Sequence, residues 1–327
     1  MDVWGAVLLI AALGWTYLAA VVSGGRASPV VGAFLLAGVG YVAGRIGGTY
    51  LPALIPGAVA LVAVAIAARA PADVLSSDPL SGPFGYANAK GAFFALAAVA
   101  ALMVAASSIH VALRIPAVLA AVALAAVPFV VRSFAPGALL LLLVPLGLLP
   151  WSARSVRIAV AGSALAVMIA IGATSFLAVS YHPWPPDRGA VEDRVTEALT
   201  ERRIALWRDA IELVRDRPVT GVGPSRFAVT SPIARADEDA RWAHHAFLQQ
   251  GAEQGAPGLA ILLAVFGWAF AGLLLHPRPT RYVALGAVGL AVVGVHASID
   301  YALHFPAVPV AAAAVAGSAT AVARRAR

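Results

Sequence analysis

Long apolar runs alternate with short polar segments along most of the chain. A helix needs about 20 mostly apolar residues to cross the roughly 30 Å hydrocarbon core of a bilayer. About ten runs come close to that length: 3–22, 29–46, 51–69, 89–107, 112–131, 135–151, 156–179, 256–276, 281–300 and 303–322. The pattern predicts an all-α fold, a polytopic bundle of about ten transmembrane helices.

The stretch between the seventh and eighth runs is polar instead. Residues 181–255 carry ten Arg and twelve Asp or Glu, which predicts a large, partly helical loop outside the bilayer. The chain thus divides into about seven N-terminal transmembrane helices in residues 1–180, the loop in residues 181–255, and about three C-terminal transmembrane helices with a basic tail in residues 256–327.

The composition also indicates a membrane protein. Of the 327 residues, 61% are hydrophobic and 12% are charged. An ordinary soluble domain has about twice that share of charged residues, so the polar surface is too small to cover a soluble core. Disorder is excluded because it requires low hydrophobicity and many charges. The chain has no Cys, which excludes disulfides, thiol catalysis and thiolate metal sites.

The net charge of +7 is interpreted as a topology signal. Short cytoplasmic loops of membrane proteins are rich in Lys and Arg. An even number of spans places the following basic residues in the cytoplasm: Arg45, Arg154, Arg157, Arg278, Arg281, Arg324, Arg325 and Arg327. The loop of residues 181–255 is then extracytoplasmic, although Arg26, Arg69, Lys90 and Arg132 would be external too. The basic excess is therefore not the footprint of a nucleic-acid-binding surface.

Within the loop, residues 203–217 have helical periodicity, with apolar side chains at three- and four-residue steps. Pro218 ends this helix, and the segment Thr220–Pro224 is a turn. An amphipathic helix that rests on the membrane or on the bundle, without a further role, accounts for the pattern equally well. A second helix is expected to run from Arg241 through Gln250 toward Glu253.

Two histidines, His244 and His245, come just before the eighth run. A neutral imidazole accepts a proton from a hydroxyl near neutral pH, so it suits a general base. A histidine pair at the level of the lipid headgroups, without a catalytic role, fits the chemistry as well. Adjacent histidines point to different helix faces, which argues against a metal site. The acidic triplet Asp237–Asp239 is expected to be a solvated turn, and Gly221–Gly223 lacks the Lys of a phosphate-binding loop.

Taken in order, these segments resemble the O-antigen ligase and O-antigen polymerase superfamily. In the loop, Arg203–Trp207, Asp216–Phe227 and His244–Gly258 are similar to the family's Arg-x3-Trp, Pro-x-x-Gly-x-Gly-x-x-x-Phe and His-Asn-x-aromatic-Leu-Gln-x3-Glu-x-Gly-x-x-Gly. Outside the loop, Leu80–Ala89 resembles the family's Gly-x-Phe-x-x-x-Asn segment, and Val295–Tyr301 resembles its late span. The five segments together cover most of the chain from residue 80 onward.

The sequence departs from the family pattern in places. His245 stands where the family has Asn. The family often opens a middle span with Ser-Arg-Gly-Ala, whereas this chain has Arg132–Ala138, so that arginine is displaced or replaced by Arg132. About ten spans, where the family usually has about twelve, suggest a shortened N-terminal half.

The resemblance implies a multi-pass glycosyltransferase of the cell membrane. Members transfer glycan from an undecaprenyl-diphosphate carrier to an acceptor hydroxyl on the external membrane face. The acceptor is a glycan, a lipid or a protein, and ligases share these motifs with polymerases. Neither a metal nor a cofactor is expected. His244 matches the family's histidine and is expected to take the acceptor proton, while the lipid diphosphate leaves from the opposite side of the anomeric carbon, with inversion.

Arginines are expected to stabilise the charge on the leaving diphosphate, because the planar guanidinium binds phosphate oxygens bidentately. Arg203 is the first choice, by its match to the family's Arg-x3-Trp position, and Arg132 is the second. The remaining candidates for lining the site are His245, Arg226, Arg241, Asn88 and Lys90. Surface charges are the alternative, and the favoured one, for Arg226 and Arg241, and a helix-entry turn is the alternative for Asn88 and Lys90. Glu253 is expected to cap a helix or contact a loop, because nine residues separate it from His244.

A transporter or flippase for a lipid-linked glycan is the alternative. Such proteins carry ionisable residues in the middle of their spans. Here the run interiors are nearly free of charge, with Asp300, His296 and His304 as the exception near an external helix end. The lack of an internal repeat and the large loop also argue against transport.

Overall fold

The computed structural model describes residues 2–76, 78, 82–107, 111–148, 194–236, 241–276 and 281–321. The seventh apolar run (156–179), the acidic triplet Asp237–Asp239 and several topology arginines (Arg154, Arg157, Arg278, Arg324, Arg325 and Arg327) lie outside the described residues. The helices of the described part are α1 (Asp2–Ser23), α2 (Ser28–Tyr50), α3 (Leu54–Arg69), α4 (Pro71–Leu75), α5 (Ala87–Ser107), α6 (Val111–Val130), α7 (Phe134–Leu148), α9 (Arg194–Asp216), α10 (Phe227–Thr230), α11 (Pro232–Ala236), α12 (Ala246–Leu274), α13 (Arg281–Ala297), η1 (Ala302–His304) and α14 (Ala307–Thr320).

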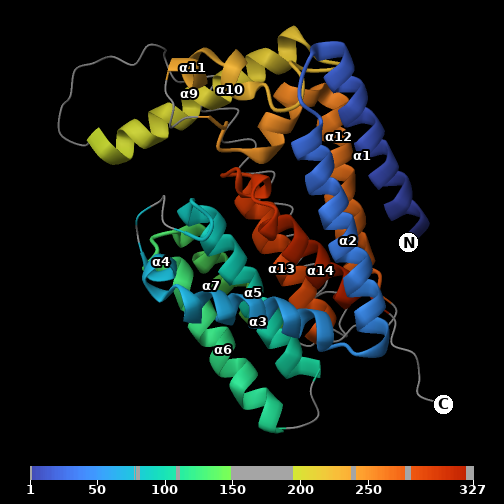
Figure 1. The fold of residues 1–327 in the computed structure, drawn as a ribbon, viewed down its shortest axis with the longest axis vertical. Coiled ribbons are helices and arrows are strands. Elements are labelled where there is room, and N and C mark those ends of the chain that lie inside the picture. The colour runs from blue at the N-terminus through green and yellow to red at the C-terminus, as the bar shows by residue number, and fades with distance from the viewer. Residues whose placement is uncertain are drawn as a thin grey trace.

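The helices form a bundle with a layer of loop helices across one end (Figure 1). Helices α1, α2 and α12 run along one side of the molecule, α13 and α14 lie in the middle, and α5, α6 and α7 stand on the other side. Helix α3 lies across the direction of its neighbours, while α9, α10 and α11 make up the end layer. The loop helices are tied to the bundle through α12, which packs against both α1 and α9.

The prediction of an all-helical membrane protein is confirmed for the described residues, which contain no strand. Five helices, α1, α2, α5, α6 and α12, are long and apolar enough to cross a membrane. Four shorter apolar helices accompany them: α3, part of α7, α13 and α14. The expected count of about ten spans stays a prediction.

Several helix boundaries differ from those expected from the sequence. The second loop helix begins at Ala246, not at Arg241, because the side chain of His245 caps it: His245 Nδ1 accepts a hydrogen bond from the Leu248 backbone N–H at 3.3 Å. That helix then continues into the eighth apolar run as the single element α12. The first loop helix, α9, begins earlier than residue 203, at Arg194.

The core lies around α5 and α13. Nearly every side chain of α5 from Ala89 to Ala101, and every side chain of α13 from Val283 to Ala297, is buried. The outer helices α1, α2 and α6 instead expose large apolar side chains such as Ile10, Val39 and Leu119. An apolar outer surface around an apolar core is the arrangement expected of helices surrounded by lipid.

Small residues allow α2 and α14 to pack closely, and these two helices share the most extensive contact in the described part. A Cβ atom added at Gly44 would collide with the backbone of Ala314, and one added at Gly40 would lie 2.8 Å from the Val310 carbonyl oxygen. Membrane helices associate through such small-residue seams because their backbones can approach each other. At one end of the seam, Arg45 forms an ion pair with Asp2 at 2.8 Å and donates to the Thr320 carbonyl oxygen.

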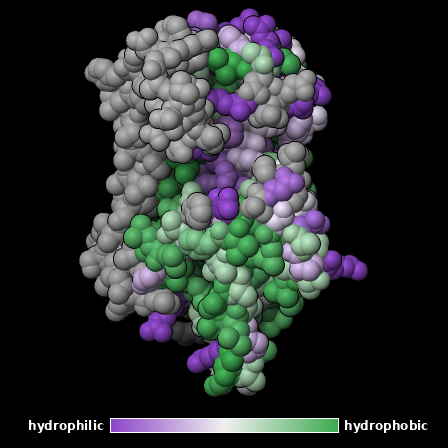
Figure 2. Space-filling model, turned by 90° about the vertical axis from the view of Figure 1, so that its left-hand side faces the viewer, coloured by the Kyte–Doolittle hydropathy of each residue, from purple (hydrophilic) through white to green (hydrophobic). Residues whose placement is uncertain are grey.

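Hydrophilic residues gather in a hollow between the apolar helices and the loop layer (Figure 2). The apolar helices form a broad hydrophobic band on one side of this hollow. The loop layer therefore covers a polar space at the end of the bundle.

Candidate active site

A break in α12 joins the loop layer to the bundle. Gly255 has a left-handed backbone (φ 70°) inside α12, and the Ala256 backbone N–H donates to the Pro218 carbonyl oxygen at 2.8 Å. A Cβ at Gly255 would lie 2.4 Å or less from the Val219 backbone. Glycine is required because it alone adopts this conformation without a penalty and leaves room for the turn.

The turn after α9 is fixed against the same break. The backbone N–H groups of Val222 and Gly223 donate to the carbonyl oxygens of Ala252 and Glu253, each at 2.9 Å. Gly221 (φ 62°) faces that backbone so closely that a Cβ would lie 2.6 Å from the Ala252 carbonyl oxygen. The Gly-x-Gly segment therefore serves to dock the turn onto α12.

The buried carboxylate of Glu253 completes this joint. It accepts hydrogen bonds from the backbone N–H groups of Ser225, at 2.8 Å, and Phe227, at 3.1 Å. Gln249 Nε2 donates to it at 3.3 Å. The loop-contact role expected of Glu253 is what the structure shows, since its side chain meets the turn before α10 and makes no contact of its own with His244.

The His244–His245 pair lies where the loop enters α12. His244 has a left-handed backbone (φ 49°), an uncommon conformation for a residue other than Gly, Asn or Asp. Its Nδ1 atom is buried and makes no hydrogen bond with the described residues. Its ring and that of Tyr301 form a T-shaped pair, with ring centroids 4.7 Å apart and an interplanar angle of 82°. Nδ1 of His245 is occupied by its cap role, while its Nε2 is buried and makes no hydrogen bond with the described residues. Of the two rings, His244 is the one that contacts Tyr301.

Asp300 is the acidic centre of the site. This residue, between α13 and η1, is 1% exposed. Its carboxylate accepts hydrogen bonds from the Tyr86 hydroxyl at 2.7 and 2.9 Å, from Asn88 Nδ2, and from its neighbour's backbone N–H (Tyr301) at 2.6 Å. Its carbonyl oxygen accepts from the Ala246 N–H at 3.1 Å. Asp300 thus joins the entrance of α5 to the loop that carries His244.

Charges from two sides act on His244. Burial lowers the pKa of its imidazole to about 4, the carboxylate of Asp300 raises it, and the guanidinium groups of Arg203 and Arg202 on α9 lower it. The imidazole is therefore neutral at ordinary pH, with one nitrogen able to accept a proton. Burial and the charge of Asp300 also raise the pKa of the Tyr301 hydroxyl, to about 12.

Asn88 links this centre to the connection between α6 and α7. While its Nδ2 donates to Asp300, its Oδ1 accepts a hydrogen bond from Ser133 Oγ at 2.9 Å. Arg132, the preceding residue, is exposed and has a left-handed backbone (φ 57°). The described residues offer the Arg132 side chain no hydrogen bond or ion pair. Arg132 is therefore held at this end of the bundle with its guanidinium uncommitted within the described part.

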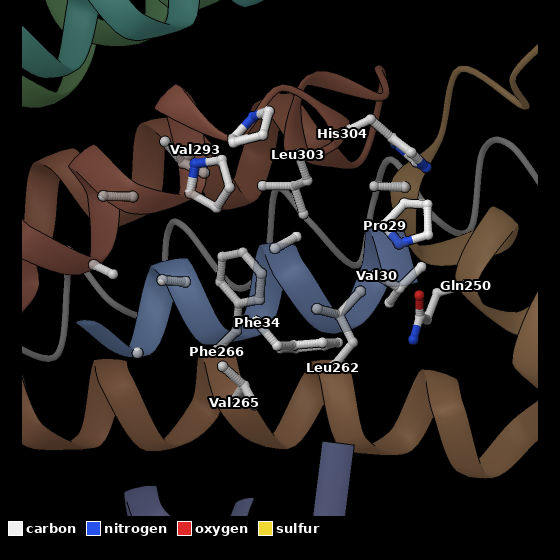
Figure 3. Close-up of a pocket in the computed structure, with 18 of the residues that line it drawn as sticks. Pro29, Val30, Phe34, Gln250, Leu262, Val265, Phe266, Val293, Leu303 and His304 are labelled. Carbon is white, nitrogen blue, oxygen red and sulfur yellow. The ribbon is translucent and has the colours of Figure 1, made fainter. Parts of the chain in front are cut away.

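A long apolar groove opens beside the site (Figure 3). Its volume is about 1360 Å³, and it is lined by α1, α2, α12, α13, η1 and α14. In the close-up, Phe34 of α2, Phe266 of α12 and Leu303 of η1 point into it. The groove ends near Arg26, Arg235 and Arg241 in the loop layer and near the Asp2–Arg45 ion pair at the other end.

An aromatic layer separates the groove from His244. Trp242 lines the groove, stacks on Tyr301 with ring centroids 5.7 Å apart, and lies 4.3 Å from the ring of His304. Tyr301 in turn contacts His244, which does not line the groove. The groove and the polar hollow therefore reach the same aromatic residues from different sides.

A comparison with known protein families identifies the family to which the chain belongs. A family model described as O-antigen ligase matches residues 84–263, which is more than half of the 327 residues. The chain belongs to the O-antigen ligase family. No curated protein matches it. Membership indicates a function of the O-antigen ligase or polymerase type at a membrane, with a lipid-linked glycan and an acceptor as partners.

The segment that matches the O-antigen ligase family, residues 84–263, contains most of the motif residues. Arg203, His244 and Asn88 lie within it, and the structure brings all three to the surroundings of Asp300. The interpretation of the chain as a member of this family, made from the order of its motifs, is confirmed.

Three other residues that the sequence suggested for the site of this O-antigen ligase family member have different surroundings. Lys90 is fully buried, and its Nζ donates to the carbonyl oxygen of Asp73 at 2.6 Å, so it fixes the segment after α3. Arg226 Nη1 donates to the carbonyl oxygen of Ser23 at 2.7 Å, which ties the loop to the end of α1. Arg241 is exposed at the mouth of the groove. Their predicted roles at the site remain untested, but Lys90 and Arg226 have structural partners.

Three residues of the site, Tyr86, Asp300 and Tyr301, were not named as site residues from the sequence. They are distant in sequence from His244, although Tyr86 lies in the segment Leu80–Ala89, and Asp300 and Tyr301 lie in the segment Val295–Tyr301, which resemble the family. A further signal was the acidic Asp300 at the end of an apolar run, since ionisable residues in membrane segments are rare and functional. For the described residues, no group of three His, Asp or Glu side chains is close enough to hold one metal ion.

Proposed function

We propose that the protein is a glycosyltransferase that moves glycan from an undecaprenyl-diphosphate carrier to an acceptor hydroxyl at the extracytoplasmic face of the cell membrane, with His244 as the general base. The observation that carries this proposal is a neutral imidazole, with a free buried Nδ1, set between the carboxylate of Asp300 and the guanidinium of Arg203. A general base must be unprotonated at the operating pH, and this environment supplies that condition.

In the proposed step, the acceptor hydroxyl gives its proton to His244 as its oxygen forms a bond to the anomeric carbon of the donor. The bond between that carbon and the diphosphate oxygen breaks on the opposite side, and its electron pair leaves with the diphosphate. The anomeric centre is inverted. Asp300 stabilises the imidazolium that forms, because a nearby carboxylate favours the charged form. The imidazolium then releases its proton to water.

Arginines stabilise the leaving diphosphate in this proposal. Arg203 lies close enough to His244 and Tyr301 for its charge to act on both, and Arg132 is connected to the same centre through Ser133 and Asn88. A fixed cation placed where negative charge develops lowers the barrier more than one that must reorganise. We assign the donor diphosphate to these two arginines, with His245, Asn88, Arg226, Arg241 and Lys90 as candidates for lining the substrate path.

The apolar groove is assigned to the hydrocarbon anchor of a lipid-borne acceptor. Its ends lie near Asp2, the first residue of the 22-residue α1, and near Arg26, just after the last residue of that helix, so it extends about 30 Å, the thickness of a bilayer core. Its volume of about 1360 Å³ exceeds the roughly 300–1,000 Å³ of small-molecule pockets. The acceptor glycan would pass over Trp242 to reach His244.

The deciding experiment adds the purified protein to a lipid-diphosphate oligosaccharide and a lipid-borne acceptor glycan in vesicles. Glycan joined to the acceptor, with release of the lipid diphosphate, supports the proposal. Movement of the donor across the bilayer without formation of a glycosidic bond would identify a flippase and overturn it. Product analysis by NMR of the anomeric proton tests inversion in the same reaction.

A further inference from the structure

Gln249 occupies the centre of a buried hydrogen-bond network beside His244. Its side chain, 1% exposed, makes three contacts with three different parts of the chain. Gln249 Oε1 accepts from the Ala243 backbone N–H at 3.1 Å, Nε2 donates to Glu253 at 3.3 Å, and Nε2 lies 3.3 Å from His304 Nε2. The proposed reaction uses none of these atoms.

The partners of Gln249 leave one orientation for its amide. A carboxylate accepts hydrogen bonds and a backbone N–H donates them, so Nε2 must face Glu253 and Oε1 must face Ala243. The second hydrogen of Nε2 then points to His304 Nε2, which must be the accepting nitrogen. His304 Nδ1 consequently carries the proton and donates to the Tyr301 carbonyl oxygen at 3.2 Å.

This network constrains His244 from two directions. Ala243 directly precedes His244, and the Ala243 N–H is the one held by Gln249. The chain of hydrogen bonds through His304 ends at the carbonyl oxygen of Tyr301. The ring of Tyr301 contacts the His244 imidazole. A left-handed backbone at a residue other than Gly persists only where its surroundings hold it.

We propose that Gln249 is a positioning residue for His244: its amide, oriented by Glu253, holds the left-handed turn that presents the imidazole to the acceptor. This inference rests on the proposed function of His244 as the base. The three contacts explain why a glutamine, with a donor and an acceptor on one side chain, occupies this buried position. An apolar side chain of the same size would leave the Ala243 N–H and one Glu253 oxygen without their partner.

The test replaces Gln249 with Met, which keeps the volume and removes both hydrogen-bonding groups. We expect kcat to fall about 100-fold, the loss typical of a misplaced reactive group, while KM for the lipid-diphosphate donor stays within about twofold. Gln254→Met is the matched control, because Gln254 is buried in the same helix but accepts from Thr16 of α1 instead, at 3.0 Å.

A second readout does not depend on turnover. Amide hydrogen exchange of residues 241–245 in the full-length protein is expected to accelerate in Gln249→Met and to stay as in wild type in Gln254→Met. Unchanged exchange there, or a kcat loss no larger than that of Gln254→Met, would overturn the inference. If wild type transfers no glycan at all, the proposed function fails, and the exchange comparison still decides whether Gln249 holds the His244 turn.

Discussion

The Tyr86 hydroxyl donates to both carboxylate oxygens of Asp300, at 2.7 and 2.9 Å, across 214 residues of sequence. This contact places the start of α5 against the α13–η1 connection, directly beside the loop that carries His244. Asp300 is thereby held near the imidazole by a partner outside the His244 motif. The arrangement separates two roles, a base on one loop and its electrostatic support on another, that can be tested one at a time.

Replacing Asp300 with Asn is expected to lower kcat and to move the acid limb of the pH–rate profile downward. The carboxylate raises the pKa of His244, so its removal lets the imidazole stay neutral to a lower pH than about 4. The rate falls nonetheless, because the imidazolium formed in the reaction loses its stabilising charge. Rates measured from pH 3.5 to 8 check both effects. Asp216→Asn, at the exposed end of α9, serves as control, and an acid limb that moves upward would contradict the assignment.

Arg203→Lys is expected to reduce turnover about 10- to 100-fold with little change in the acid limb. The substitution keeps the positive charge that lowers the pKa of His244 but loses the bidentate geometry that suits a diphosphate. Initial rates with the lipid-diphosphate donor measure the effect, alongside Arg215→Lys at an exposed position of the same helix. A rate equal to wild type would remove Arg203 from the diphosphate site.

His244→Ala is expected to abolish measurable glycan transfer, a loss of about 100- to 10,000-fold for removal of a general base. Expression level and membrane insertion should remain those of wild type, because Nδ1 of the ring makes no hydrogen bond with the described residues. Transfer is measured by the mobility shift of the acceptor. Wild-type transfer by a well-inserted variant would exclude His244 as the base.

Gly255→Ala is expected to destabilise the protein by about 2 kcal/mol or more, because it adds a Cβ against the Val219 backbone at a left-handed position. Gly267→Ala, in the same helix, has no atom within 4 Å of the added Cβ and should be neutral or slightly stabilising. Thermal unfolding in detergent compares the two variants. Equal Tm values would show that the joint between α12 and the Pro218 turn is unimportant for stability.

Val265→Trp is expected to obstruct the apolar groove, into which Val265 of α12 faces (Figure 3). KM for a lipid-borne acceptor should rise about tenfold. A tenfold loss of affinity corresponds to about 1.4 kcal/mol of binding free energy. Transfer to the same glycan released from its lipid should be unaffected. An increase in KM for the donor instead would assign the groove to the donor carrier.

The apolar helices could be predicted from sequence because their signal is local. Runs such as 3–22 and 29–46 became α1 and α2 within a few residues. The prediction was less accurate where caps decide a boundary, as at His245, or where Pro306 lies inside an apolar run, so that α14 begins only at Ala307.

The candidate site was predictable only in part. Arg203 and His244 belong to ordered motifs in one loop, and their order was enough to indicate the family. The surroundings of His244 depend on tertiary contacts instead: neither Tyr86 nor Asp300 has a neighbour in sequence that reveals the other. For Lys90 and Arg226 the predicted place at the site stays a prediction, since a basic residue near a helix end satisfies backbone carbonyls as readily as it binds a phosphate.

The turn at Gly255 has a consequence for where bonds can be made relative to the membrane surface. Because Ala256 is tied to Pro218 and the backbone of Ala252 and Glu253 is tied to the Gly221–Gly223 turn, the loop layer cannot slide along α12. The distance of the imidazole from the apolar part of α12 is therefore set by a helix, at 1.5 Å per residue. In the proposed reaction, this fixed distance would favour membrane-anchored sugars whose hydroxyl stands at the matching distance from the lipid.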